Sequence, residues 1–269
     1  MLQLTAPGPQ QVQYRAAGQA AQATHVLLHG IGSASASWAE QLRAAEGRAD
    51  LRLLAWDAPG YGQSAPVAPA SPQPGDYGER VWQWLDDLGE RAPVVLVGHS
   101  LGALMAGAAT RLQPGRVKSL VLLSPAAGYG DAPQAEREDK LNKRLDALRR
   151  LGPEGMAHER AAAMLSPAAS AEQVQAVRTN MAQVHPEGYT QAARMLAHGV
   201  LLRELAGLRC PVTVACGSLD AITVPSACQA VAHGLGLPLV DLGPVGHACP
   251  LEGARAVNRL LGLEPKEPT

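Results

Sequence analysis

Short apolar runs bounded by glycine or proline recur along the chain and predict buried β-strands. Segments with the 3.6-residue period of an amphipathic helix separate most of these runs, and the clearest cover residues 77–91 and 103–113. Strands and helices that alternate in this way build a parallel sheet with helices on both faces. The pattern therefore predicts an α/β fold, with strands at residues 25–30, 51–57, 94–100, 117–125, 211–218 and 238–243.

The alternation stops between residues 128 and 207, where the pattern is helical and contains no convincing strand. A helical block between two strands of a sheet is typical of an insertion that covers a binding site. We therefore expect a core domain of residues 1–127 and 208–269 and a helical cap, or lid, of residues 128–207.

Three helices are expected inside the cap. The first should cover about 134–151, because leucines fall on one stripe there while charged residues occupy the other faces. The second should begin after Ser170, an N-cap residue with a glutamine three positions later, and end at the break made by Pro186. The third should run from Pro186 to Gly199.

Composition narrows the class of protein and of partner. The 269 residues are 46% hydrophobic with a formal net charge of −1, which favours a globular protein and gives no electrostatic support for nucleic acid or an acidic membrane as partner. No basic leader precedes an apolar run, and no window reaches the about 18 apolar residues of a membrane span, so a cytoplasmic location is expected. Phenylalanine is absent and aromatic residues total 3%, so any pocket should be mainly aliphatic. The last six residues, EPKEPT, read as a loose tail.

The segment VVLVGHSLGA, residues 94–103, is typical of a nucleophile held on a tight turn between a strand and a helix. It places Ser100 between Gly98 and Gly102, after a run of β-forming residues and before a run of helix-forming ones. Such a turn forces the nucleophile into a sparsely populated backbone conformation, so its neighbours must lack bulk. We therefore interpret Ser100 as a catalytic serine.

A serine hydroxyl is a weak nucleophile at neutral pH and needs a base, which in turn needs a group that holds its tautomer. His247 lies in a glycine-flanked loop after the last predicted strand, and Asp220 follows the strand before it. Both should reach the carboxyl-terminal edge of the sheet, where open α/β sheets bind ligands. Asp57 also follows a strand, but its simpler interpretation is that it stabilises the turn in which it lies. His29 and His99 also lie in turns, where we expect them to form hydrogen bonds to the backbone.

An acyl-transfer site also needs donors for the developing oxyanion. We assign these to the backbone N–H groups of Ile31, which two glycines flank, and Leu101, which follows the serine at the start of the helix. Substrate contacts are predicted at the following residues: Gly30, Tyr129, Met156, Met164 and Tyr189. The four cysteines show no metal-ligand spacing and are expected to be free thiols, with Cys249 as a buried filler near the site.

Five ordered motifs resemble those of the α/β-hydrolase family across nearly the whole chain. They are HGIG, WDAPGYGQS, GHSLGA, the Asp220 loop and GHACPLE. The chain order Ser100, Asp220, His247 is also the order of that family. The resemblance implies an α/β-hydrolase fold with a mostly parallel eight-stranded sheet, helices on both faces and a cap insertion, and it implies no metal and no cofactor.

Within that family, the cap stretch VRTNMAQVHPEGYTQAARML is most similar to the 3-oxoadipate enol-lactone hydrolases. Carbon–carbon bond hydrolases of ring-fission products share HGIG-S and Trp38, but they carry asparagine before the nucleophile and tryptophan after the catalytic histidine. His99 and Ala248 occupy those two positions here.

The expected function is a serine hydrolase that cleaves a small carboxylic ester or lactone through an acyl-enzyme. A carbon–carbon bond hydrolase for a vinylogous diketone is the alternative function, and a ligand receptor on the same scaffold is a third candidate function. A dinucleotide fingerprint in GIGSAS is rejected, because Ser35 replaces its third glycine. The acyl and alcohol parts of the substrate and the oligomeric state stay open.

Overall fold

The computed structural model describes residues 4–5 and 12–264, and within them the chain forms one eight-stranded sheet. The strand order is β1-β2-β4-β3-β5-β6-β7-β8. The pairs β1–β2 and β2–β4 are antiparallel, and every other pair is parallel. The predicted fold class is confirmed. The strands are β1 (Leu4–Thr5), β2 (Tyr14–Gly18), β3 (His25–Leu28), β4 (Arg52–Trp56), β5 (Val94–His99), β6 (Val117–Leu123), β7 (Val212–Cys216) and β8 (Leu239–Asp241).

Each of the six apolar runs contains one of the strands from β3 to β8, whereas β1 and β2 have no counterpart among those runs. All five residues of β2, YRAAG, are only partly buried, so the strand has neither a continuous apolar run nor an alternating pattern. Its place in the sheet comes from antiparallel pairing with β4, which no local pattern encodes. The predicted EPKEPT tail lies outside the described residues apart from Glu264.

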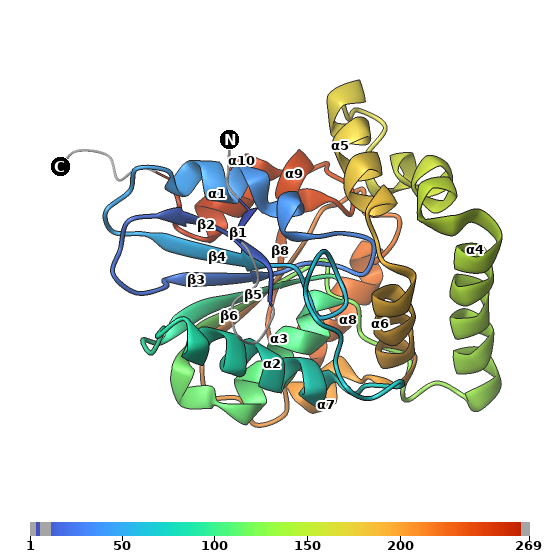
Figure 1. Cartoon of the computed structure of the whole chain (residues 1–269), viewed down its shortest axis with the longest axis horizontal. Helices are drawn as coiled ribbons and strands as arrows, with labels where there is room; N and C mark the ends of the chain where they lie inside the picture. The colour runs from blue at the N-terminus through green and yellow to red at the C-terminus, as the bar shows by residue number, and fades with distance from the viewer. Residues whose placement is uncertain (1–3, 6–11, 265–269) are drawn as a thin grey trace.

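Helices cover both faces of the sheet, as Figure 1 shows, with α1, α9 and α10 on one side and α2, α3 and α8 on the other. Two apolar clusters, one on each face, form the core. The α-helices are α1 (Ala39–Ala45), α2 (Pro74–Asp87), α3 (Gly102–Leu112), α4 (Gln134–Arg160), α5 (Ala171–Ala182), α6 (Pro186–His198), α7 (Leu201–Glu204), α8 (Pro225–Gly234), α9 (Cys249–Glu252) and α10 (Ala254–Leu260). The short 3₁₀ helices are η1 (Ser35–Trp38), η2 (Pro114–Arg116) and η3 (Ala162–Met164).

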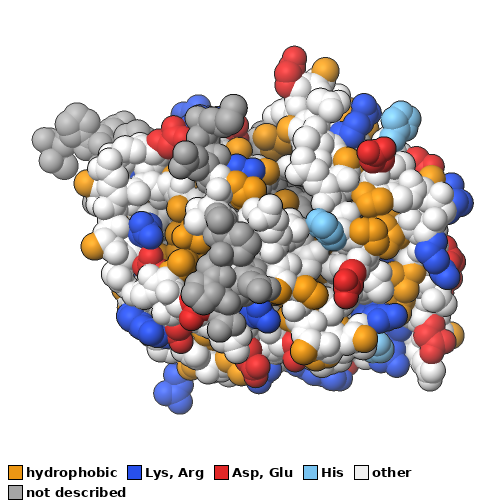
Figure 2. Space-filling view, viewed as in Figure 1, with side chains coloured by type: hydrophobic (Ala, Val, Ile, Leu, Met, Phe, Trp, Pro, Cys, Tyr) orange, Lys and Arg blue, Asp and Glu red, His pale blue; other side chains and the backbone are white. Residues whose placement is uncertain are grey.

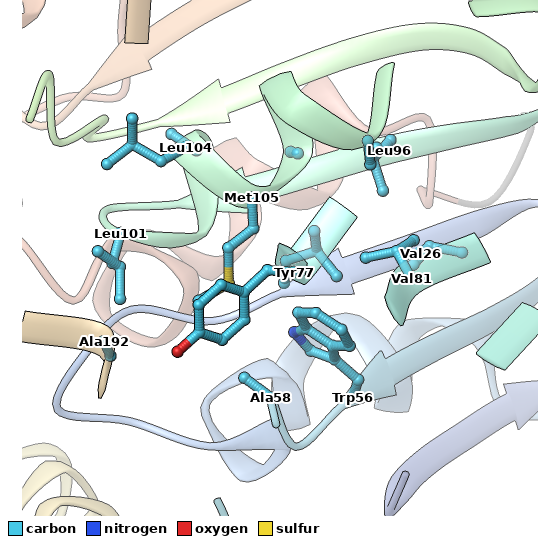
Figure 3. Packing of buried hydrophobic residues seen from close by; sticks show 14 of the residues in the cluster. Val26, Trp56, Ala58, Tyr77, Val81, Leu96, Leu101, Leu104, Met105 and Ala192 are labelled. Carbon is cyan, nitrogen blue, oxygen red and sulfur yellow. The ribbon is translucent and has the colours of Figure 1, made fainter. Parts of the chain in front are cut away.

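The larger core cluster extends from the sheet into the helical block. Figure 3 shows Trp56 of β4, Tyr77 of α2 and Met105 of α3 in one group, with Ala192 of α6 at its margin. Each of the four is at most 1% exposed. The block of residues 128–207 therefore shares apolar packing with the sheet, and its assignment as a separate cap domain remains a prediction.

The three helices expected in this block are present beside the sheet (Figure 1). The helix expected over 134–151 is the first part of α4, which continues to Arg160 after a kink at Gly152, where φ is 62° and ψ is 177°. Helix α5 begins after Ser170, whose hydroxyl accepts a hydrogen bond from the Gln173 amide in a capping box. Helix α6 begins at Pro186, as its fixed φ favours.

Charged side chains of both signs are interspersed over the face shown in Figure 2. Among the residues that the structure describes, no helix is both long enough and apolar enough to cross a bilayer.

Candidate active site

The carboxyl ends of β3, β5, β7 and β8 lie at one edge of the sheet, because these strands run parallel to their neighbours. Ile31, Ser100, Asp220 and His247 follow these four strands in turn. Ile31, Ser100 and His247 line one cavity, and Asp220 contacts His247 from behind it. The fold thus brings together four residues that are up to 216 positions apart in the sequence.

Ser100 lies on a strained turn between β5 and α3. Its φ of 53° is in the left-handed region, which costs a residue with a side chain about 1–3 kcal/mol. A Cβ atom at Gly102 would lie 2.3 Å from the Leu28 carbonyl oxygen, and one at Gly98 would lie 2.5 Å from the Gly102 carbonyl oxygen. Glycine is therefore required on both sides of the serine, as the sequence pattern predicts. Ser100 is buried, with 7% of the residue exposed, at the cavity wall.

Asp220 and His247 form a buried pair, in which Nδ1 of the imidazole lies 2.9 Å from Oδ2 of the carboxylate. The other carboxylate oxygen, Oδ1, accepts hydrogen bonds from the backbone N–H groups of Ile222, at 2.8 Å, and Thr223, at 3.0 Å. The Thr223 hydroxyl donates to Oδ2 at 2.9 Å. The carboxylate is held on both oxygens, so it can hold the imidazole in the tautomer with a proton on Nδ1.

Burial raises the pKa of Asp220, but the hydrogen bond from His247 and the charge of that ring outweigh burial and bring the pKa down to about 2. The carboxylate is therefore ionised at neutral pH. Burial, together with the neighbouring His247, lowers the pKa of His99 to about 3. His99 is thus a neutral ring at neutral pH, next to the imidazole of His247.

The His247 loop is held by contacts on two sides. The Nε2–H of His99 donates to the His247 carbonyl oxygen at 2.8 Å, and the two rings lie 4.9 Å apart between centroids. On the other side of the loop, the Ala248 N–H donates to the Met164 carbonyl oxygen at 2.7 Å. The position of His247 therefore depends on both the β5 turn and the helical block.

Two backbone N–H groups, those of Ile31 and Leu101, lack an acceptor within the described residues. The peptide carbonyl joined to each of them is anchored. The Gly30 oxygen accepts a hydrogen bond from Nδ1 of His29 at 2.8 Å, and the Ser100 oxygen accepts two backbone hydrogen bonds, each of 3.1 Å. Because a peptide group is planar, these bonds also fix the directions of the two free N–H groups. The two N–H groups are therefore fixed in direction and free of an acceptor among the described residues, and their role as oxyanion donors remains a prediction.

The cavity encloses about 770 Å³ of empty space, its mouth included. The five residues predicted to contact substrate all lie in its wall: Gly30, Tyr129, Met156, Met164 and Tyr189. Their role in binding remains a prediction. Met181 of α5 and Leu196 of α6 add apolar surface, so aliphatic and methionine side chains share the wall with polar and aromatic ones.

The rival acid, Asp57, does not line this cavity. Its Oδ1 accepts a hydrogen bond from the Ser35 N–H at 2.7 Å, and its carbonyl accepts one from the Ser64 hydroxyl, so Asp57 braces the turn after β4 as predicted. His29 has the expected backbone role as well, since its Nε2 accepts from the Ala58 N–H at 2.9 Å. The remaining histidines of helical segments are exposed: His158, His185, His198 and His233.

All four cysteines are free thiols. Cys249 is fully buried, with its sulfur 3.9 Å from the Ser124 hydroxyl, and burial raises the pKa of its thiol. Its position agrees with the expected filler role. Among the described residues, no group of three or more histidine, cysteine and acidic side chains is placed to hold a metal ion.

Sequence reasoning missed three residues near the site. Thr223 is the first, and an aspartate followed three residues later by a threonine could have indicated it, because both side chains cap such turns. Arg144 and Arg160 of α4 line the cavity. In the sequence they belong to a helix rich in arginine and lysine, where nothing separates them from residues on the solvated face.

The alpha/beta hydrolase family model matches residues 26–260. The chain is 29% identical, over 257 residues, to a protein of Variovorax paradoxus (strain S110) named "Putative carbamate hydrolase RutD"; the match covers 93% of this chain and 94% of the relative. An esterase structure from Thermogutta terrifontis superposes with a TM-score of 0.81 at 23% identity, covering 97% of this chain and 95% of that one. The enol-lactonase structure from Burkholderia xenovorans LB400 superposes with a TM-score of 0.79 at 22% identity, covering 97% and 98%.

The two structural matches show a shared fold, and the family match spans most of the sequence, including every residue of the site just described. This chain therefore belongs to the alpha/beta hydrolase family of enzymes.

Proposed function

We propose that this enzyme is a serine hydrolase that cleaves a small carboxylic ester or lactone through an acyl-enzyme, with Ser100 as nucleophile, His247 as base and Asp220 as the orienting acid. The buried 2.9 Å contact between Asp220 and His247, behind a cavity whose wall carries Ser100 on its strained turn, is the observation that carries the proposal. This combination places an oriented base and a serine hydroxyl at one cavity, where the base can activate the hydroxyl.

In the first step, the Ser100 oxygen attacks the substrate carbonyl while His247 takes the hydroxyl proton on Nε2. The imidazolium that forms is stabilised by the ionised Asp220 carboxylate. The carbonyl oxygen becomes an oxyanion, which the N–H groups of Ile31 and Leu101 receive. Each such donor contributes about 3 kcal/mol in enzymes of this kind. The alcohol leaves with the proton from His247, and the acyl group remains on Ser100.

In the second step, His247 removes a proton from a water molecule that attacks the acyl carbon. The oxyanion forms again at the same two N–H groups, and its collapse releases the acid and returns the proton to Ser100. For a lactone, the alcohol and the acid are parts of one product. Both steps use the same residues, so no further catalytic group is required.

His99 and Ala248 favour ester or lactone cleavage over the carbon–carbon alternative. The hydrolases of ring-fission products carry asparagine and tryptophan at these two positions. Here the His99 side chain donates to a backbone carbonyl and is neutral, and the Ala248 side chain is a single methyl group. The aliphatic and methionine side chains in the cavity wall suit a small acyl chain.

Hydrolysis of p-nitrophenyl butyrate by purified protein tests the proposal. Ser100→Ala should reduce turnover by several orders of magnitude, and Ser71→Ala, at an exposed loop serine, should leave it unchanged. A fluorophosphonate should react with the wild type with loss of fluoride, and peptide mass spectrometry should locate the adduct on Ser100. Equal turnover by Ser100→Ala, or an adduct elsewhere, would refute the assignment. Tight ligand binding without turnover would favour the receptor instead.

A further inference from the structure

The active-site cavity contains two cations and, among the described residues that line it, no acidic side chain. The cations are Arg144 and Arg160, both from α4, and the rest of the wall consists of apolar groups, neutral polar groups and histidines. Building on the proposed function, we propose that the substrate is an ester or lactone that carries a free carboxylate, and that Arg144 and Arg160 bind this carboxylate.

Arg160 is a half-buried cation with no partner among the residues that the structure describes. Within the described part of the chain, its guanidinium forms neither a hydrogen bond nor an ion pair, although it has five N–H donors and is always charged. The acid next to it in the sequence, Glu159, pairs with Arg150 at 3.7 Å instead. A cation at the wall of a largely apolar cavity is stabilised when an anion binds there.

Arg144 is fixed in place by two hydrogen bonds that leave its charge unneutralised. Its Nη1 donates to the Lys140 carbonyl oxygen at 3.1 Å, and its Nη2 donates to the Tyr129 hydroxyl at 3.2 Å. The guanidinium carbon also lies 5.4 Å from the centre of the Tyr129 ring. Neither partner is an anion, and the other three N–H donors have no acceptor in the described part of the chain. A guanidinium held in this way loses little conformational freedom when a ligand binds.

A carboxylate matches this pair of groups in shape and charge. The planar fork of a guanidinium binds the two oxygens of a carboxylate through parallel hydrogen bonds, which a lysine could not do. The apolar side chains of Met156 and Met164 in the same wall lower the local dielectric constant, which strengthens the attraction between the guanidinium groups and a carboxylate. A neutral substrate would leave both cations without an anion.

The proposed catalytic residues and the two arginines come from different parts of the fold. Ser100 and His247 project from loops at the sheet edge, whereas both arginines belong to α4, beyond that edge (Figure 1). The carboxylate should therefore be separated from the reacting carbonyl by a short carbon chain. A monoester of a small dicarboxylic acid, or a lactone with a carboxylate substituent, has this arrangement.

A matched pair of esters tests the proposal: mono-p-nitrophenyl adipate, which is anionic, and its neutral analogue p-nitrophenyl methyl adipate. For the wild type, kcat/KM should be at least about tenfold higher for the anionic ester, mainly through a lower KM, since a charge-assisted hydrogen bond contributes about a tenfold to hundredfold effect. The double variant R144Q/R160Q should bring the ratio of the two kcat/KM values close to one. Arg149→Gln, at a 72% exposed side chain of the same helix, should keep the wild-type ratio.

Calorimetric binding of adipate provides a readout that does not depend on turnover. The wild type should bind adipate but not dimethyl adipate, and R144Q/R160Q should lose binding while its circular dichroism spectrum and unfolding temperature stay unchanged. If kcat/KM is equal for the two esters and hydrolysis still depends on Ser100, the carboxylate-binding site would be refuted while the proposed function would stand.

If neither ester is hydrolysed, that result would count against the proposed function. The binding of adipate would then test the arginine site separately. Adipate binding by the wild type that is lost in R144Q/R160Q would support the arginine site. No adipate binding, or binding of inorganic phosphate in its place, would overturn it.

Discussion

Replacing Asp220 by asparagine changes one oxygen of a buried carboxylate into an amide nitrogen, with almost no change in shape. The wild-type carboxylate accepts two hydrogen bonds from backbone N–H groups, one from the Thr223 hydroxyl and one from His247, and the Cys216 thiol is a weaker fifth donor at 3.9 Å. An asparagine has only one accepting oxygen. The donors that contact one of the two carboxylate oxygens in the wild type must therefore face the NH₂ group of the asparagine in the variant.

The two backbone N–H groups are fixed by the turn, so the asparagine oxygen should stay with them and its NH₂ should face His247. Nδ1 of His247 must then accept a hydrogen bond, and the ring proton moves to Nε2. An Nε2–H cannot take the proton of Ser100. In serine proteases with this triad, the corresponding change costs about 10⁴-fold in kcat, which equals about 5.5 kcal/mol of transition-state stabilisation.

The assay is p-nitrophenyl butyrate hydrolysis under saturating substrate, with far-ultraviolet circular dichroism to check that the variant is folded. Asp220→Asn should lose about 10⁴-fold in kcat. Asp241→Asn, at the exposed end of the neighbouring strand β8, is the matched control and should retain wild-type kcat. A folded Asp220→Asn protein with near-wild-type kcat would refute the reasoning, and a comparable loss in Asp57→Asn instead would identify the other aspartate as the acid.

Three further predictions concern stability. The pKa of Asp220 is lowered from 3.8 to about 2 on folding, so this group should contribute about 2 kcal/mol to the free energy of unfolding above pH 5. This contribution should be lost as pH falls through 4 toward 1, and urea unfolding across pH should show the loss in the wild type and not in Asp220→Asn. Gly98→Ala should destabilise the protein by about 1–3 kcal/mol, because its Cβ would lie 2.5 Å from a backbone oxygen, while Gly115→Ala, with no atom within 4 Å, should have little effect in the same measurement. Thr223→Val removes a donor to a buried carboxylate and should cost about 1.5–3 kcal/mol in urea unfolding, with kcat also reduced; unchanged values of both would contradict its role.

The strands and helices α5 and α6 show how much structure a local sequence pattern can predict. Strands β3 to β7 are mainly apolar because helices cover both faces of the parallel part of the sheet, whereas the edge strand β8 is only partly buried. Helices α5 and α6 begin at Ala171 and Pro186, because the Ser170 capping box and the fixed φ of proline act over a few residues. These elements are therefore predictable from short segments. The strand β2 is not, since its partly buried residues carry no periodic signal and its pairing partner lies about 40 residues away.

The amino-acid sequence by itself determined the turn around Ser100, because glycine at positions 98 and 102 is a local steric requirement of the β5–α3 turn. It also determined which histidine and which acid follow the last two parallel strands. Only the tertiary structure decided that Asp220 and His247 touch, that Thr223 holds the carboxylate, and that Arg144 and Arg160 face the cavity. These contacts depend on the order of strands in the sheet and on how α4 packs beside it, and such long-range packing leaves no mark on the residues of any short segment.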